Sequence, residues 1–302
     1  MAARTTPAPG SGRWPSFIIR LLSRLPLPLL YLLADTLYGL LYHVFRFQRA
    51  LVTDNLAACF PQRPEAEVRR LAAAAYRNAL HILFETIGSL GMDDGALLER
   101  IPVENPELIE SLVREHRTVI TAAAHHGNWE WLQLASSARV ETPVTALYKS
   151  LNRSAIDALL LQLRSRFGSR LLEARTALPE LLKSAREPGV IALVADQAPR
   201  PEEEKYWGTL LGRDTAFYPG LERLARLFRA PVVFAHLQRT GRGRYRVRFE
   251  QIASPPYEGS EGAIMDAYIQ AVERQIREAP QDWFWPYKRW KYQRPLYDSS
   301  GS

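Results

Sequence analysis

The chain has 302 residues, enough for one large α/β domain or two smaller domains with buried cores. Hydrophobic residues make up 47% and charged residues 24%, which excludes disordered, collagen-like and low-complexity classes. The single cysteine, Cys59, excludes a disulfide framework and Cys-rich zinc or iron–sulfur sites. The net charge is +7, and only five of the 39 basic residues are Lys, so the remaining 34 are Arg. Arg suits bidentate contacts with phosphate and carboxylate, although a GC-rich genome gives the same bias.

The first 50 residues hold most of the positive charge, with six Arg against one acid, Asp35. Residues 1–15 are rich in Pro, Gly, Ser and Thr and are predicted to form a disordered tail. Residues 17–47 are mostly apolar, and no small-residue cleavage site follows them, so a cleavable signal peptide is not expected. The apolar run is interrupted by Arg20, Arg24, Pro26, Pro28 and Asp35.

Three structures are compatible with residues 16–48. They could form one transmembrane helix of about 20 residues. They could lie in the membrane interface, or form a helix pair in the core of a soluble domain. Arg residues flank the apolar run and attract anionic headgroups, so we expect 16–48 to be a membrane-anchor helix, followed by a catalytic domain over 49–302.

Beyond residue 50, helical and strand-like patterns follow one another. The apolar spacing of residues 65–89 predicts a helix that begins after Pro64. Residues 190–195 form a continuous apolar run, typical of a buried strand in the middle of a sheet. This order predicts one α/β domain with a mixed, largely parallel central sheet flanked by helices. Further strands are predicted over 118–124, 143–148, 231–237 and 245–249, and further helices from 128 and over 155–167, 178–185, 217–228 and 264–276.

The chain lacks a P-loop, a dinucleotide-binding glycine motif and a G-x-S-x-G elbow. The most informative stretch is 124–130, Ala-His-His-Gly-Asn-Trp-Glu, where a predicted strand ends and a helix begins. Ligands bind at this edge of open α/β sheets. Glu130 could fold back to His125 across the turn that Gly127 permits, which would make His125 a general base.

The same stretch is compatible with two different roles. His126 and Glu130, spaced i and i+4 on a helix, could bind a metal together with His125. The two histidines could also simply close the strand, with backbone groups as partners. No further histidine has ligand spacing, so we expect no metal.

The 125–130 motif resembles the H-x4-[DE] signature of the late (lauroyl/myristoyl) acyltransferases of lipid A biosynthesis. The resemblance extends over most of the chain and includes the glycerolipid-acyltransferase-like fold. Lys149-Ser150 and Tyr287-Lys288 depart from the family's usual Arg-Pro and His-Arg, which leaves the substrate less certain than the chemistry. Besides the signature, segments similar to family motifs occur in order at 49–61, 148–152, 163–168, 195–197, 212–216 and 283–291.

The resemblance implies that His125, held by Glu130, deprotonates a hydroxyl, which then attacks an acyl thioester without a covalent enzyme intermediate. Arg164 and Arg166 are expected to bind the acceptor's phosphate or developing negative charge, unless they form a solvated helix face. Arg289 and Lys291 could contact phosphate or an acidic carrier, or belong to a basic tail. The remaining substrate-binding candidates are Asn128, Lys149, Asp196 and Gln197, of which the last two could instead form a cap or turn.

The resemblance thus implies acyl transfer from acyl-acyl carrier protein, or acyl-CoA, to a phosphorylated membrane glycolipid, most simply a lipid A precursor. No cofactor and no nucleic-acid partner are expected. The implied location is the bacterial inner membrane, with the catalytic domain on the cytoplasmic face. The alternatives are acylation of another glycolipid such as a phosphatidylinositol mannoside, a non-catalytic lipid-binding protein, and a metal-dependent hydrolase at the membrane.

Overall fold

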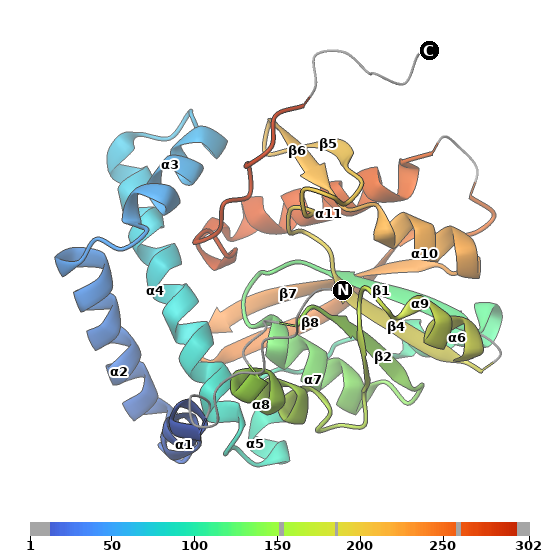
Figure 1. Cartoon of the computed structure of the whole chain (residues 1–302), viewed down its shortest axis with the longest axis horizontal. Helices are drawn as coiled ribbons and strands as arrows, with labels where there is room; N and C mark the ends of the chain where they lie inside the picture. The colour runs from blue at the N-terminus through green and yellow to red at the C-terminus, as the bar shows by residue number, and fades with distance from the viewer. Residues whose placement is uncertain (1–12, 151–153, 185–186, 258–260, 295–302) are drawn as a thin grey trace, which may run out of the picture.

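The computed structural model describes residues 13–150, 154–184, 187–257 and 261–294. Residues 1–12 of the predicted tail, and the 151–152 part of the 148–152 motif, lie outside the described residues. The remaining tail residues begin α1 (Arg13–Leu22), so the part of the tail that the structure describes is helical. The chain forms a central sheet with helices on both faces (Figure 1).

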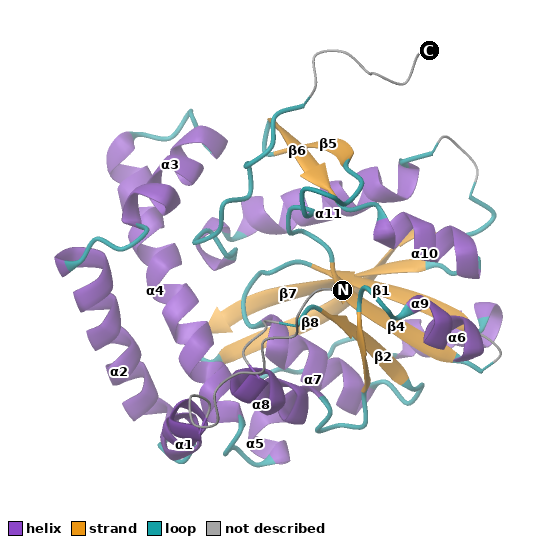
Figure 2. Cartoon of the chain, in the orientation of Figure 1, coloured by secondary structure: helices purple, strands orange, loops and turns teal. Residues whose placement is uncertain are grey.

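The six-stranded sheet has the order β3-β2-β4-β1-β7-β8. Every neighbouring pair is parallel except the hairpin at the β7–β8 edge (Figure 2). The predicted mixed, largely parallel sheet is therefore confirmed. Its strands are β1 (Thr118–Ala123), β2 (Val144–Tyr148), β3 (Arg170–Glu173), β4 (Gly189–Val194), β7 (Val232–Gly241) and β8 (Arg244–Ala253).

Each face of the sheet buries its own hydrophobic cluster, because successive side chains of a strand point to opposite faces. One cluster includes residues of α3 (Arg49–Cys59), α9 (Leu178–Ser184), α10 (Gly220–Phe228) and α11 (Ala263–Glu278). The other includes residues of α2 (Leu27–Tyr38), α5 (Asp94–Leu98), α6 (Glu107–His116), α7 (Trp129–Arg139) and α8 (Ser154–Arg164).

The long periodic pattern gave the most accurate prediction, since α4 spans Glu65–Ser89 as expected. Short elements were missed. β3 has four residues and no buried one, and the hairpin of β5 (Tyr206–Leu210) and β6 (Arg213–Phe217) is only partly apolar. Such segments carry neither a helical nor an alternating pattern, and their pairing partners decide their structure.

The N-terminal apolar segment contains the predicted apolar helix, but a break at 23–26 falls inside the predicted bounds of 16–48. It divides into α1, α2, which begins after Pro26, and a π-helical turn (Gly39–Val44). Within the described residues, Leu27–Val44 is the one helical stretch long and apolar enough to cross a membrane. One side of α2 packs against α4, and the other exposes Leu29, Leu32 and Leu33.

Asp35 joins α2 to the body of the protein. Its carboxylate accepts two hydrogen bonds of 2.7 Å from Arg77, lies 2.7 Å from His81 Nε2, and accepts a 3.3 Å bond from Arg242 in the β7–β8 hairpin. The hydrogen bonds from Arg77 outweigh burial and lower the pKa of the Asp35 carboxyl well below its usual range.

Replacement of Asp35 by Asn is expected to lower the free energy of unfolding by about 1–2 kcal/mol at pH 7, because charged hydrogen bonds are lost. A carboxyl whose pKa is depressed on folding stabilises the protein above its unfolded pKa, and this contribution is lost as the pH falls through the folded value. The difference between wild type and Asp35→Asn in denaturant unfolding should therefore shrink below about pH 4. Glu115→Gln, which alters an exposed carboxylate, is the control and should have a negligible effect.

Candidate active site

The turn from β1 to α7 carries the histidines. Gly127 has φ +56°, which favours glycine, and a Cβ at this position would lie in tight contact, 3.1 Å from Leu237 and Tyr245. Asn128 caps α7 by accepting a 3.1 Å hydrogen bond from the Trp131 amide. The C-terminal segment holds the same turn, since Gly127 N donates to Asp282 O (2.8 Å) and Phe284 N to His125 O (2.9 Å).

The His125 imidazole is oriented by Asp196, which follows Ala195 just after the end of the neighbouring strand β4. Nδ1 lies 2.5 Å from Asp196 Oδ1, and the His125 backbone amide donates to Oδ2 (3.0 Å). A carboxylate only accepts, so Nδ1 carries the hydrogen and the lone pair is on Nε2. The Gln197 amide nitrogen lies 3.2 Å from this Nε2.

Asp196 is buried and accepts a third hydrogen bond, 2.7 Å long, from the Trp283 indole. Burial alone would raise the pKa of its carboxyl. The His125 imidazole and the hydrogen bonds from His125 and Trp283 outweigh burial and lower this pKa. The ionised Asp196 is therefore suited to stabilise an imidazolium.

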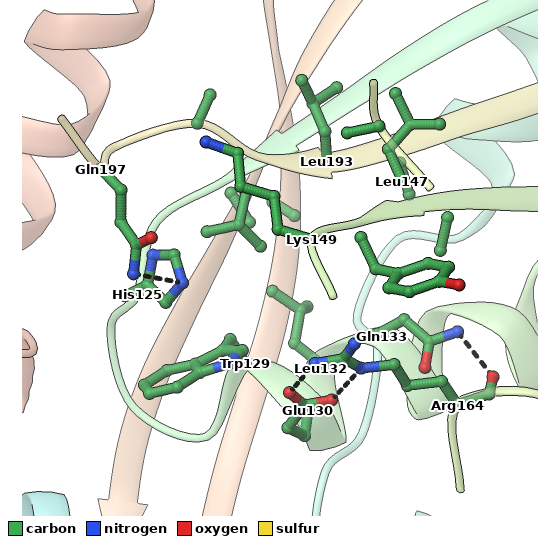
Figure 3. Close-up of a pocket in the computed structure, with 18 of the residues that line it drawn as sticks. His125, Trp129, Glu130, Leu132, Gln133, Leu147, Lys149, Arg164, Leu193 and Gln197 are labelled. Atoms are coloured by element: carbon green, nitrogen blue, oxygen red, sulfur yellow. Dashed lines mark hydrogen bonds and ion pairs between the residues drawn. The ribbon is translucent and has the colours of Figure 1, made fainter. Parts of the chain in front are cut away.

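Glu130 does not contact His125, which corrects the predicted His125–Glu130 pair. The side chain of Glu130 accepts two hydrogen bonds from Arg164, of 2.6 and 2.8 Å, in a bidentate ion pair. Helix α7 directs the Glu130 carboxylate toward Arg164 on α8. The carboxylate that orients His125 is that of Asp196, which follows strand β4. The Glu130–Arg164 pair nevertheless lies in the same site as His125 (Figure 3).

His125, Glu130 and Arg164 line a cavity of about 970 Å³, at the upper end of the usual size of ligand pockets. The Trp129 ring lies beside the histidine, with its centroid 4.9 Å from that of His125, and the Phe284 ring packs against Trp129. Most of the lining is aliphatic, with contributions from β2, β4, α4, α7, α9 and α10. This composition suits a hydrocarbon chain rather than a polar metabolite.

Two further predicted residues, Lys149 and Gln197, line this cavity. Asn128 is buried, where it caps α7 and donates to Glu85 (3.1 Å), so its predicted contact with substrate is wrong. Arg166 is also turned away from the cavity, because it donates to Asp94, Ser89 O and Met92 O. Its role is to join the α8 end to α5.

Arg289 is buried, so a surface contact with phosphate or a carrier protein is wrong for this residue. Nη1 donates to Ala216 O (2.7 Å), and the guanidinium lies over the Phe217 ring. Burial lowers the pKa of Arg289 to about 10. Lys291 lies near the Tyr292 ring, outside the cavity lining.

The three candidate metal ligands have different partners. His126 is buried with Nε2 3.0 Å from Ala279 O, and burial lowers its pKa to about 4. Glu130 is paired with Arg164, and His125 with Asp196. Within the parts of the chain that the structure describes, no group of three His, Cys, Asp or Glu side chains is arranged to hold a metal ion.

Sequence reasoning missed the role of Trp283 and assigned Asp196 to substrate binding. Asp196 lies 71 positions from His125, and no spacing rule relates them. The signal in the sequence was topological, since both residues follow predicted parallel strands and β1 pairs with β4. The carboxyl ends of neighbouring parallel strands place such residues side by side.

The open α/β sheet thus carries a carboxylate-oriented histidine at its carboxyl edge with a large aliphatic cavity beside it, an arrangement suited to an enzyme that transfers an acyl chain. Residues 14–292 match the family described as bacterial lipid A biosynthesis acyltransferases, and the chain belongs to this family. It is 24% identical over 281 residues to a lipid A biosynthesis lauroyltransferase of Escherichia coli (strain K12), covering 91% of this chain and 89% of the relative. It is 22% identical over 283 residues to a palmitoleoyltransferase of the same organism and to a lipid A biosynthesis acyltransferase of Shigella flexneri, covering 92% of this chain and 89% of each relative.

Proposed function

We propose that the protein transfers a fatty acyl chain from acyl-acyl carrier protein, or acyl-CoA, to a hydroxyl of a phosphorylated lipid A precursor. The observation that carries this proposal is the His125–Asp196 pair at the wall of an aliphatic cavity of about 970 Å³. Membership of the family and the activities for which the relatives are named support the same substrate class.

In the proposed reaction, His125 Nε2 removes the proton of the acceptor hydroxyl as its oxygen attacks the thioester carbonyl. The tetrahedral intermediate collapses and expels the thiolate, which takes the proton back from the imidazolium. Asp196 keeps Nδ1 protonated throughout and stabilises the imidazolium. No covalent enzyme intermediate is required, and no cofactor takes part.

We propose that Arg164, one of the cations that line the cavity, acts on the reacting groups. The ion pair with Glu130 fixes the guanidinium in the cavity wall. The guanidinium therefore does not depend on a substrate phosphate for a partner. We propose that the pair presents an N–H group to the oxygen that becomes negative in the transition state. Lys149, which also lines the cavity, is the better candidate for the acceptor's phosphate.

Arg164→Gln is expected to lower kcat by about 10²-fold with little change in KM, because a donor used in the transition state is lost. Arg164→Lys should restore little, since a lysine cannot make the bidentate contact with Glu130. Steady-state transfer assays test this. Arg170→Gln, which breaks an exposed ion pair with Glu180, should behave as wild type. Wild-type kcat in Arg164→Gln would remove Arg164 from the mechanism.

We also propose that the protein works at the cytoplasmic face of the bacterial inner membrane. The exposed apolar side of α2 supports membrane contact. The exposed lysine Lys291 is one candidate contact for the acidic carrier protein. These assignments concern partners, and they are tested separately from the chemistry.

The direct test is transfer of a radiolabelled acyl group by the purified protein, from acyl-carrier protein and from acyl-CoA, to a lipid A precursor. Mass spectrometry of membrane glycolipids with and without the protein should show one secondary acyl chain that depends on it. Acylation of a phosphatidylinositol mannoside instead would change the acceptor and keep the chemistry. Lipid binding without any transfer would refute the proposed activity.

A further inference from the structure

The cavity extends along both faces of the sheet. Side chains of a strand alternate between faces, and both sets line the cavity. Val190 and Ala192 of β4 pair with Val144 and Ala146 of β2 on one face. Leu147 and Leu193 line the cavity from the other face (Figure 3). We call these two parts the α7 arm and the α9–α10 arm.

The α7 arm is enclosed. Its lining includes Leu132, Ile109, Val140 and Val144, all of which are buried. A chain that enters this arm from the His125 end therefore meets a wall of packed aliphatic side chains.

The α9–α10 arm is open. Its floor includes Leu181 and Leu221, which are buried in the core cluster of that face. Its rim consists of Leu178, Tyr218 and Leu227, which are 46%, 40% and 52% exposed although they line the cavity. Large apolar side chains that are both half-exposed and cavity-lining give this arm an exposed apolar mouth, a feature of membrane and protein contact sites.

The cavity also reaches the apolar N-terminal surface. Phe47, which follows the π-helical turn, lines the same cavity and is 56% exposed. The neighbouring Val44 and Phe45 are also exposed. A single cavity thus reaches from the segment expected at the membrane to the open arm between α9 and α10.

We propose that the α9–α10 arm is a second hydrocarbon-chain site, which holds a chain of the acceptor lipid and receives it from the bilayer. The α7 arm then holds the acyl chain of the donor. This inference rests on the proposed function, because only a reaction between two lipid-bearing molecules needs two chains at one histidine. The closed arm fits a chain delivered on a soluble carrier, and the open arm fits a chain that stays partly in the membrane.

Two substitutions separate the arms. Leu224→Trp fills the α9–α10 arm, and Ala192→Leu narrows the α7 arm. Leu182→Trp is the matched control, since Leu182 is an exposed α9 residue outside the cavity lining. Each variant is assayed with donor thioesters of increasing chain length, and with a lipid A precursor whose acyl chains are either complete or truncated.

Leu224→Trp is expected to raise KM for the complete acceptor at least about tenfold, with an unchanged donor-length optimum and no effect on the truncated acceptor. Ala192→Leu should move the donor optimum to shorter chains and leave the acceptor KM unchanged. Because tryptophan could disturb the core, Leu227→Gln at the half-exposed rim provides a second variant, with a smaller rise in acceptor KM.

A change of donor optimum in Leu224→Trp, or kinetics identical to Leu182→Trp in both Leu224→Trp and Leu227→Gln, would overturn the assignment of the open arm. Failure of the proposed function is distinguishable, since the wild-type protein would then acylate neither form of the lipid A precursor.

Discussion

Replacement of His125 by Ala is expected to reduce kcat/KM for acyl transfer by about 10³–10⁴-fold while leaving the thermal unfolding midpoint nearly unchanged. Nε2 of this imidazole is the one basic atom that Asp196 orients within the cavity. The side chain is partly exposed toward that cavity, so its removal does not open a gap in the core. Transfer kinetics and calorimetry of the purified variant measure both effects.

His236→Ala is the control for this experiment. His236 is a partly exposed strand residue whose Nε2 lies 2.9 Å from Glu278, outside the cavity lining. Its removal should change kcat/KM by less than about twofold. Substantial transfer by His125→Ala, at more than about a tenth of the wild-type rate, would show that His125 is not the base.

Asp196→Asn is expected to lower kcat by about 10³-fold or more, because the amide no longer fixes the tautomer or stabilises the imidazolium. Loss of the carboxylate makes protonation of the histidine less favourable. The low-pH limb of the rate profile should therefore move to lower pH, which a purely structural defect would not cause. The profile is measured by transfer kinetics from about pH 5 to 9, with calorimetry to confirm folding.

Glu130→Gln is the matched comparison, since it also replaces a buried carboxylate with an amide in the same site. It loosens Arg164 and should reduce kcat by about 10–10²-fold without moving the low-pH limb. The opposite ranking, with a shifted limb in Glu130→Gln and a normal one in Asp196→Asn, would restore Glu130 as the partner of His125.

The N-terminal helix is connected to the turn that carries His125 through one buried carboxylate. Glu85 on α4 accepts hydrogen bonds from Tyr31 of α2 (2.9 Å), Tyr245 of β8 (2.6 Å) and Asn128 (3.1 Å). Arg239 lies 3.5 Å from the same carboxylate and supplies the opposite charge. Helix α2 is therefore part of the packing that holds the α7 cap, besides offering an apolar surface to a membrane.

The C-terminal aromatic segment also holds residues of the site in place. Trp283 donates to Asp196, and Tyr287 OH accepts from Ala198 N (3.2 Å). Asn55 on α3 lies 3.3 Å from Tyr287 O and holds this segment in place. The family motif at 283–291 thus holds the His125–Asp196 pair from the interior, where the sequence had suggested contacts with phosphate.

The sequence by itself determined the features that depend on local pattern. Hydrophobic periodicity predicted α4 in full, and the strand-turn-helix of residues 118–130 placed His125 at the carboxyl edge of the sheet. The ordered motifs indicated the family that the match over 14–292 confirmed. These features depend on residues that are close in the sequence or on the identity of single residues. They can therefore be predicted from one sequence without knowledge of the tertiary contacts.

Only the tertiary structure decided which side chains meet. Asp196 reaches His125 because β4 lies beside β1, and Glu130 is taken by Arg164 because α8 packs near α7. Arg289 and Asn128 became interior groups for the same reason, since burial depends on neighbours that are distant in the chain. A hydrogen bond forms only when donor and acceptor lie about 3 Å apart. Strand order decides which side chains come that close, and the spacing of residues in the sequence does not reveal the strand order.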